Sequence, residues 1–143
     1  MKAIRLRFPL ALLACAAVVL AACSTGTAGS VAPPGVPAAL PLEVSPVEGA
    51  RLQAEGALVL DVREPDEWAT GHVPGATLIP LGTLSGRFGE LPRERELVVI
   101  CRTGNRSAQA RDLLLAAGFP AVTSVAGGIG AWAAAGLAIE PGS

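Results

Sequence analysis

Short apolar runs constrain the fold of this chain more than any other feature of its sequence. Ala57–Val62 and Glu96–Ile100 are nearly continuous in Leu, Val and Ile. Such runs are typical of strands that are buried on both faces of a parallel sheet. With three shorter segments they predict a sheet of about five strands. The predicted strands are Leu42–Ser45, Ala57–Val62, Ala76–Ile79, Glu96–Ile100 and Ala121–Val125.

Helix patterns alternate with these strands. The predicted helices are Pro46–Ala54, Glu64–Thr70, Leu81–Phe88, Arg106–Ala117 and Ile129–Ala135. Ser45 is the expected N-cap of the first helix, and Glu48 completes a capping-box pattern. Gly82 and Gly86 weaken the third helix. Strict alternation of strands and helices predicts an α/β fold whose central parallel sheet has helices on both faces.

The first 22 residues have the pattern of a secretion signal. Basic residues precede the apolar run Phe8–Leu20, which is too short to span a bilayer because a span needs about 20 residues. The run ends in Leu-Ala-Ala-Cys23, which resembles the lipobox of bacterial lipoproteins. By that resemblance the chain is cleaved before Cys23 and carries a lipid there. Ser24 follows instead of Asp, so an outer membrane is favoured in an organism with two membranes.

The predicted mature chain is therefore an exported, membrane-anchored lipoprotein of the bacterial cell envelope. Residues 23–41 are rich in Pro, Ala, Gly and Ser and predict an extended tether, which leaves 42–143 as the domain. Loss of the signal removes three of the eleven basic residues and none of the twelve acidic ones, which gives a net charge of −4. With no basic stripe and few aromatic residues, a nucleic-acid partner is not expected.

The cysteines point to chemistry at one position. Cys15 leaves with the signal and Cys23 carries the lipid, so Cys101 is the only thiol expected in the mature chain. A buried, inert cysteine is the alternative. Against it, Cys101 follows a predicted strand and precedes a loop with two arginines and a predicted helix. Loop N–H groups and a helix N-terminus stabilise a thiolate, so Cys101 is the candidate nucleophile.

Four motifs, in order and spacing, resemble a single-domain rhodanese over about Leu42–Gly136. They are Asp61–Trp68, Gly71–Ala76, Cys101–Ser107 and Gly127–Trp132. The resemblance implies the rhodanese α/β fold and a persulfide on Cys101. It also implies transfer of a sulfane sulfur from a donor such as thiosulfate to cyanide or a thiol. Small sulfur-containing anions and a thiol, cyanide or protein acceptor are the partners expected.

The residues after Cys101 are the candidate substrate-binding loop. Arg102 and Arg106 are expected to attract an anionic donor and to help sulfite leave. An alternative role for Arg106 is structural, as the partner of Asp61 or another acidic group in an ion pair. Gly104 lets the loop curl without a Cβ.

Other positions in these motifs have mainly supporting roles. Thr103 and Asn105 are expected to shape the loop and influence which acceptor fits, while Ser107 is a helix-cap candidate. Asp61 and Arg63 follow a buried strand, so they either face the site or form an ion-pair network. His72 is favoured as a structural imidazole over a general base, and Trp68 and Trp132 are expected to be core aromatics.

Loop length separates the candidate reactions. Four residues lie between Cys101 and Arg106, whereas phosphatases that resemble this loop have five. The shorter loop favours one sulfur atom over a tetrahedral oxyanion, so sulfur transfer is preferred to phosphatase or arsenate reductase activity. A sulfur-carrier module without turnover stays open. Neither metal-ligand spacing nor a dinucleotide pattern occurs, so no metal and no cofactor are expected.

Overall fold

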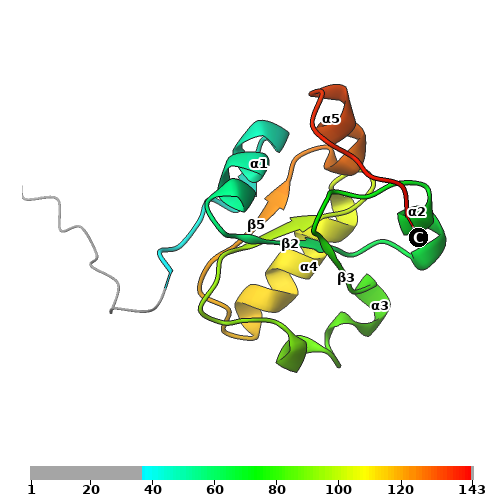
Figure 1. Ribbon diagram of the computed structural model, residues 1–143. Coiled ribbons are helices and arrows are strands. Elements are labelled where there is room, and N and C mark those ends of the chain that lie inside the picture. Colours follow the sequence, from blue (N-terminus) through cyan, green and yellow to red (C-terminus); the bar gives the residue numbers. More distant parts are fainter. Residues whose placement is uncertain (1–36, 143) are drawn as a thin grey trace, which may run out of the picture. The chain divides into compact units, whose positions relative to one another are not determined.

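The computed structural model describes residues 37–142, which form a five-stranded sheet (Figure 1). The strands are β1 (Glu43–Val44), β2 (Leu58–Asp61), β3 (Thr77–Leu78), β4 (Leu97–Ile100) and β5 (Val122–Val125). Their order is β1-β5-β4-β2-β3, and every neighbouring pair is parallel. The prediction of about five parallel strands is confirmed. The predicted signal peptide and Cys23 lie outside the described residues.

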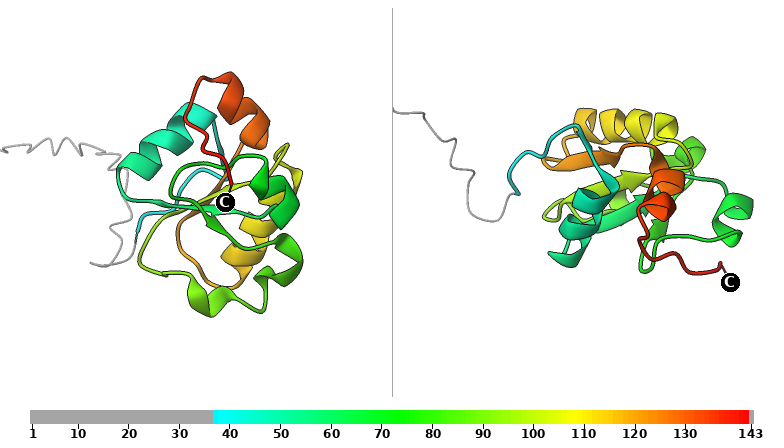
Figure 2. Two further views of the ribbon diagram at one scale, coloured as in Figure 1. Left: turned by 45° about the vertical axis from the view of Figure 1, so that its right-hand side comes forward. Right: turned by 90° about the horizontal axis from the view of Figure 1, so that it is seen from above.

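Helices cover both faces of the sheet, as predicted (Figure 2). They are α1 (Pro46–Ala54), α2 (Pro65–Ala69), α3 (Leu81–Leu84), α4 (Asn105–Ala116) and α5 (Gly128–Ala134), with a 3-10 turn at Phe88–Glu90. Leu52 of α1 and Trp132 of α5 belong to the core on one face. Leu84 of α3 and Leu114 of α4 belong to the core on the other. None of the helices within 37–142 combines the length and apolarity needed to cross a membrane.

Strand β4 lies at the centre of the sheet and decides where the cysteine points. Its four residues are fully buried, and burial of each aliphatic side chain contributes about 1.5–3 kcal/mol. Leu97 and Val99 pack on the face covered by α3 and α4, whereas Val98 and Ile100 pack on the opposite face. Cys101 continues this alternation and joins the cluster of Leu97 and Val99. The strand therefore delivers the sulfur to the side of α4.

Two local predictions differ from the structure. The helix expected over Leu81–Phe88 ends at Leu84, and a 3-10 turn follows at Phe88–Glu90. Gly86 between them favours the break, because glycine loses more backbone entropy in a helix than other residues do. Ser45 does cap α1 by accepting from the N–H of Glu48 at 3.2 Å. The carboxylate of Glu48 does not complete the capping box but accepts from Arg51 Nε at 2.9 Å.

The segment after α5 returns to the loop that follows α2. His72 and Glu140 exchange two main-chain hydrogen bonds of 2.9 Å. The indole N–H of Trp132 donates to the carbonyl of Ala138 at 3.1 Å. The first pair ties the loop after α2 to the end of the described chain, and the second holds that end against α5.

Candidate active site

Cys101 stands at the carboxyl end of β4, directly before α4. This is where sites form in parallel sheets, because the strand ends and the helix N-termini meet there. Its side chain is 1% exposed, and among the described residues it is the one cysteine, with a free thiol. Gly104 is the N-cap of α4 and has a φ of +103°. A Cβ there would lie 3.3 Å from the N of Gly127, so glycine suits both the backbone angle and the space.

Loop donors surround the sulfur of Cys101. The N–H of Gly104 donates to Sγ at 3.1 Å. Burial raises the pKa of Cys101, but the Ser107 hydroxyl and the N–H groups of Ser107, Thr103 and Gly104 outweigh burial and lower that pKa below its ordinary value. The N-terminus of α4 adds partial positive charge at the same place. The site therefore favours a thiolate.

Ser107 does not have the helix-cap role expected of it. Helix α4 begins at Asn105, two residues before Ser107, because Gly104 takes the N-cap position. Ser107 is fully buried, and its hydroxyl donates to the carbonyl of Gly104 at 2.9 Å. The hydroxyl has a single proton, which can turn instead to the sulfur of Cys101, and that hydrogen bond lowers the pKa of the thiol. The residue thus braces the loop backbone and faces the sulfur.

The N-terminus of α5 holds the loop from outside the site. The N–H of Ile129 donates to the carbonyl of Cys101 at 2.7 Å. Gly128 has a φ of +60°, and a Cβ there would overlap that same carbonyl. Gly127–Trp132 is among the motifs of the resemblance, but the sequence did not predict this contact. Two adjacent glycines were the available signal, because close backbone approach excludes a side chain.

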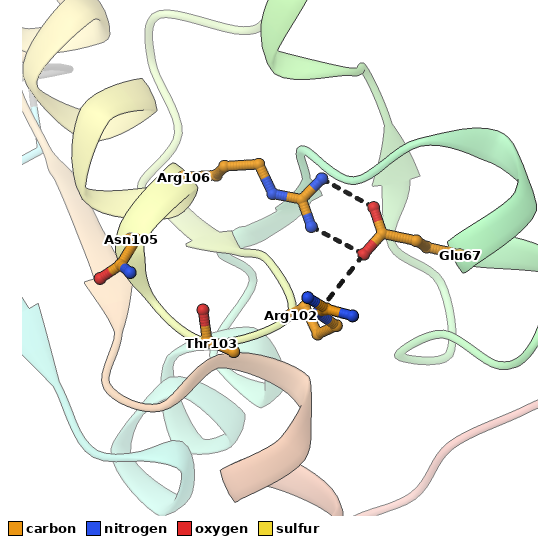
Figure 3. Close-up of a pocket in the computed structure, with 5 residues that line it drawn as sticks. All are labelled: Glu67, Arg102, Thr103, Asn105 and Arg106. Carbon is orange, nitrogen blue, oxygen red and sulfur yellow. Dashed lines mark hydrogen bonds and ion pairs between the residues drawn. The ribbon is translucent and has the colours of Figure 1, made fainter.

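A pocket of about 480 Å³ opens over the loop (Figure 3). It is lined by Glu67, Arg102, Thr103, Asn105 and Arg106. Four of the five predicted substrate-binding residues therefore line one cavity. The fifth, Gly104, is buried beneath them beside the sulfur.

Glu67 of α2 is the pocket residue that sequence reasoning missed. Its two carboxylate oxygens accept from the two terminal nitrogens of Arg106, each at 2.7 Å. The Arg106 guanidinium lowers the pKa of Glu67 to about 2. The acidic brace expected as an alternative for Arg106 is thus Glu67 and not Asp61. Arg102 is 73% exposed at its side chain, with Nε 3.9 Å from the same carboxylate.

Asp61 and Arg63 form a buried ion pair instead of lining the pocket. Arg63 Nε lies 2.9 Å from both carboxylate oxygens of Asp61, and Nη2 lies 2.7 Å from Oδ2. Arg63 also donates to the main-chain carbonyls of Gly71 at 2.9 Å and Glu67 at 3.1 Å. Of the two alternatives, the structure favours the ion-pair network. The pair positions α2, and with it the carboxylate of Glu67.

His72 and Trp68 pack against each other away from the pocket. Their rings stack with centroids 3.6 Å apart, and His72 Nε2 lies 3.1 Å from Oε1 of Glu140. This arrangement agrees with a structural imidazole. Trp68 is only half-buried, so its assignment to the core is wrong, whereas Trp132 is a core residue at 2% exposure. Within residues 37–142 no cluster of three His, Cys or carboxylate side chains is placed to hold a metal.

Proteins similar to this chain carry the names of sulfur-handling proteins. The family model of the rhodanese-like domain matches residues 45–135. A sulfurtransferase of Allochromatium vinosum is 41% identical over 85 residues, which are 59% of this chain and 79% of that protein. Thiosulfate sulfurtransferase GlpE of Pseudomonas entomophila is 35% identical over 89 residues, 62% of this chain and 82% of that protein.

A sulfur carrier and a solved structure extend the comparison. YrkF of Bacillus subtilis, which bears the name of a putative sulfur carrier protein, is 38% identical over 78 residues, 54% of this chain and 42% of YrkF. The crystal structure of a rhodanese-related protein from Thermoplasma volcanium has a TM-score of 0.64 and 32% identity. The match covers 68% of this chain and 96% of that one. The α/β architecture expected from the sequence is thus shared with known structures.

Proposed function

This chain belongs to the rhodanese family, and we propose that it transfers a sulfane sulfur through a persulfide on Cys101. Sulfurtransferases and a sulfur carrier among the relatives support sulfur transfer as the general activity. The proposal names the residues. Cys101 is the nucleophile, and Arg102, Thr103, Gly104, Asn105 and Arg106 bind the donor.

The first half of the cycle loads the cysteine. The thiolate of Cys101 attacks the sulfane sulfur of thiosulfate and forms a new S–S bond. The S–S bond of thiosulfate breaks, and sulfite leaves with its electron pair. The terminal sulfur of the persulfide is anionic, so the loop N–H groups that favour the thiolate also favour this product.

The second half returns the enzyme to its resting state. Cyanide or a thiolate attacks the terminal sulfur, and thiocyanate or a new persulfide forms. The electron pair of the broken bond returns to Cys101 as thiolate. No oxidant or reductant enters either step, which fits a site built from one thiol and anion-binding groups.

One observation carries the proposal. The N–H of Gly104 lies 3.1 Å from Sγ at the start of α4, and the pKa of Cys101 is lowered there despite burial. A buried, inert cysteine has a raised pKa, because burial disfavours the charged form. The surroundings of Cys101 therefore favour the thiolate over the thiol.

A thiosulfate–cyanide assay on the wild type and Cys101→Ser tests the proposal. Thiocyanate formation by the wild type and its loss in the variant is the expected result. A mass spectrum of the peptide with Cys101, recorded after thiosulfate and before cyanide, should show the addition of one sulfur atom. Equal thiocyanate formation by both proteins would exclude Cys101 as the nucleophile.

A sulfur-carrier role is the second candidate, and the similarity to YrkF favours it. The carrier predicts the persulfide without turnover toward cyanide or small thiols. Phosphatase or arsenate reductase activity is the third, and hydrolysis of p-nitrophenyl phosphate without sulfur loading would support it over both. Thiocyanate formation, sulfur loading of Cys101 and phosphate-ester hydrolysis together distinguish the three candidates.

The proposed place of action is the periplasmic or extracytoplasmic face of a membrane of the bacterial cell envelope, with a lipid on Cys23 and residues 23–41 as tether. The lipobox resemblance of the sequence supports this. In a bacterial host, the wild type should incorporate labelled palmitate and sediment with membranes. Cys23→Ser should incorporate no palmitate. Palmitate on the variant would contradict the assignment.

A further inference from the structure

The pocket over Cys101 carries little net side-chain charge, although two arginines line it (Figure 3). Arg102 and Arg106 are cations, and Glu67 is an anion. The thiolate of Cys101 adds a second negative charge beneath the pocket. The side-chain charges therefore cancel once the sulfur ionises. The positive potential that remains comes from main-chain N–H groups and the N-terminus of α4.

Glu67 compensates Arg106 in particular. Both terminal guanidinium nitrogens lie 2.7 Å from its carboxylate oxygens, which is the bidentate geometry of a strong pair. Arg102 lies 3.9 Å from the same carboxylate and is 73% exposed, so water screens its charge. An anion that enters the pocket therefore meets a carboxylate on its wall.

This carboxylate is fixed and ionised. Its Oε2 accepts from the N–H of Glu64 at 3.1 Å, and Arg63 Nη1 holds the main-chain carbonyl of Glu67 at 3.1 Å. The pKa of Glu67, held at about 2 by Arg106, keeps the negative charge present at every physiological pH. The side chain is 21% exposed, so its charge faces the pocket without full solvation.

Resting on the sulfur transfer proposed above, we propose that Glu67 is a specificity-determining residue that selects sulfur donors by charge. It disfavours dianions such as thiosulfate relative to monoanionic donors, the class that includes organic thiosulfonates and persulfides. At an effective dielectric constant of about 60, one unit charge about 6 Å from a bound donor in a partly hydrated site changes affinity about fivefold for each additional charge on the donor.

Thiosulfate and methanethiosulfonate form a matched pair of donors. Both are tetrahedral at the central sulfur and carry one sulfane sulfur, but a methyl group replaces one oxygen, and the charge falls from two to one. Attack by the Cys101 thiolate forms the same persulfide from each. The donor S–S bond breaks with its electron pair on sulfite in one case and on methanesulfinate in the other.

Glu67→Gln and Glu90→Gln form a matched pair of variants. The amide introduced by Glu67→Gln keeps the shape of the side chain and an oxygen for the N–H of Glu64. Glu90 forms a similar bidentate pair with Arg87, at 2.8 and 2.7 Å, outside the residues that line the pocket. Both substitutions remove one negative charge from the protein. Only the first removes it from the pocket.

The measured quantity is kcat/KM for thiosulfate divided by kcat/KM for methanethiosulfonate, with cyanide as acceptor. In a ping-pong cycle each value reports only sulfur loading, and a changed thiolate fraction affects both donors alike. The ratio should rise about fivefold in Glu67→Gln. It should stay within about 1.5-fold of wild type in Glu90→Gln, because water screens an exposed charge. An unchanged ratio in Glu67→Gln overturns the proposal.

Alkylation of Cys101 tests the pocket charge without any sulfur transfer. Iodoacetate is an anion and iodoacetamide is neutral, and mass spectrometry of the Cys101 peptide gives both rates in the full chain. The iodoacetate-to-iodoacetamide ratio should rise about threefold to fivefold in Glu67→Gln and not in Glu90→Gln. If the wild type transfers no sulfur from either donor, the proposed function fails. The alkylation ratio then decides the charge proposal, which an unchanged ratio overturns.

Discussion

Two arginine–carboxylate pairs meet at the carboxyl end of the sheet, and they differ in their access to water. Arg63 and Asp61 are 3% and 0% exposed, whereas Arg106 and Glu67 are 30% and 21% exposed. Both pairs reach helix α2, where Arg63 binds the main chain of Glu67 and Arg106 binds its side chain. Arg63 and Asp61, here called the sealed pair, determine the position of α2. Arg106 and Glu67, here called the open pair, determine the charge on the wall of the pocket.

Breaking the sealed pair should have the largest effect on stability. Arg63→Met leaves the carboxylate of Asp61 buried without its partner and frees the carbonyls of Gly71 and Glu67. Removing one member of a buried pair costs about 3–5 kcal/mol in the free energy of unfolding. Urea denaturation followed by circular dichroism measures this loss.

Arg87→Met is the control, because Arg87 is paired with Glu90 at the surface. Surface pairs contribute about 0–1 kcal/mol. A loss below about 1 kcal/mol in Arg63→Met, close to that of the control, would mean that the sealed pair does not hold α2.

Breaking the open pair should lower the free energy of unfolding by less than breaking the sealed pair. Arg106→Met removes two charge-assisted hydrogen bonds, but Glu67 keeps partial access to water, so we expect a loss of about 1–2 kcal/mol. A double-mutant cycle with Glu67→Gln isolates the pair, and its coupling energy should be about 1 kcal/mol. Additive losses would show that the two side chains act independently on stability.

The pH dependence of the open pair has a defined sign. The folded pKa of Glu67 is about 2, below its ordinary value of about 4.5, because Arg106 donates to it. The pair therefore stabilises the folded chain fully above about pH 4.5 and loses this contribution as the pH falls toward 2. After allowance for its exposure, the contribution is about 1–2 kcal/mol. The difference in unfolding free energy between wild type and Glu67→Gln should shrink over this range, and a constant difference would contradict it.

The strands and the place of Cys101 could be predicted from the sequence, but the partner of Arg106 could not. Long apolar runs predicted β2 and β4, shorter segments predicted the other three strands, and the position of Cys101 after β4 followed from its local sequence. The partner of Arg106 did not follow, because it depends on the angle at which α2 leaves the sheet. That angle rests on Arg63 contacts to carbonyls up to eight residues away.

Backbone angles limited the prediction in a second way. Gly104 adopts a left-handed conformation, so α4 starts there and places Ser107 inside the first turn beside the sulfur. Serine is a common cap residue, and only the geometry of Gly104 shows that Ser107 is not one. Likewise, the approach of Gly128 to Cys101 joins two segments that no local sequence pattern pairs.

Hydrogen-bond donors in the loop after Cys101 favour the ionised sulfur, and the smallest predicted effect tests the share of Ser107 in this. The pKa of Cys101 is lowered, against burial, by the Ser107 hydroxyl and by loop N–H groups. The wild-type pH profile of iodoacetamide reaction at Cys101 should therefore have its midpoint below the free-thiol pKa of about 8.5. Ser107→Ala removes one of several donors, so its midpoint should rise by about half a unit. Ser85→Ala makes the same chemical change at an exposed position and should leave the midpoint in place. If Ser107→Ala also leaves it in place, the main-chain donors alone hold the thiolate.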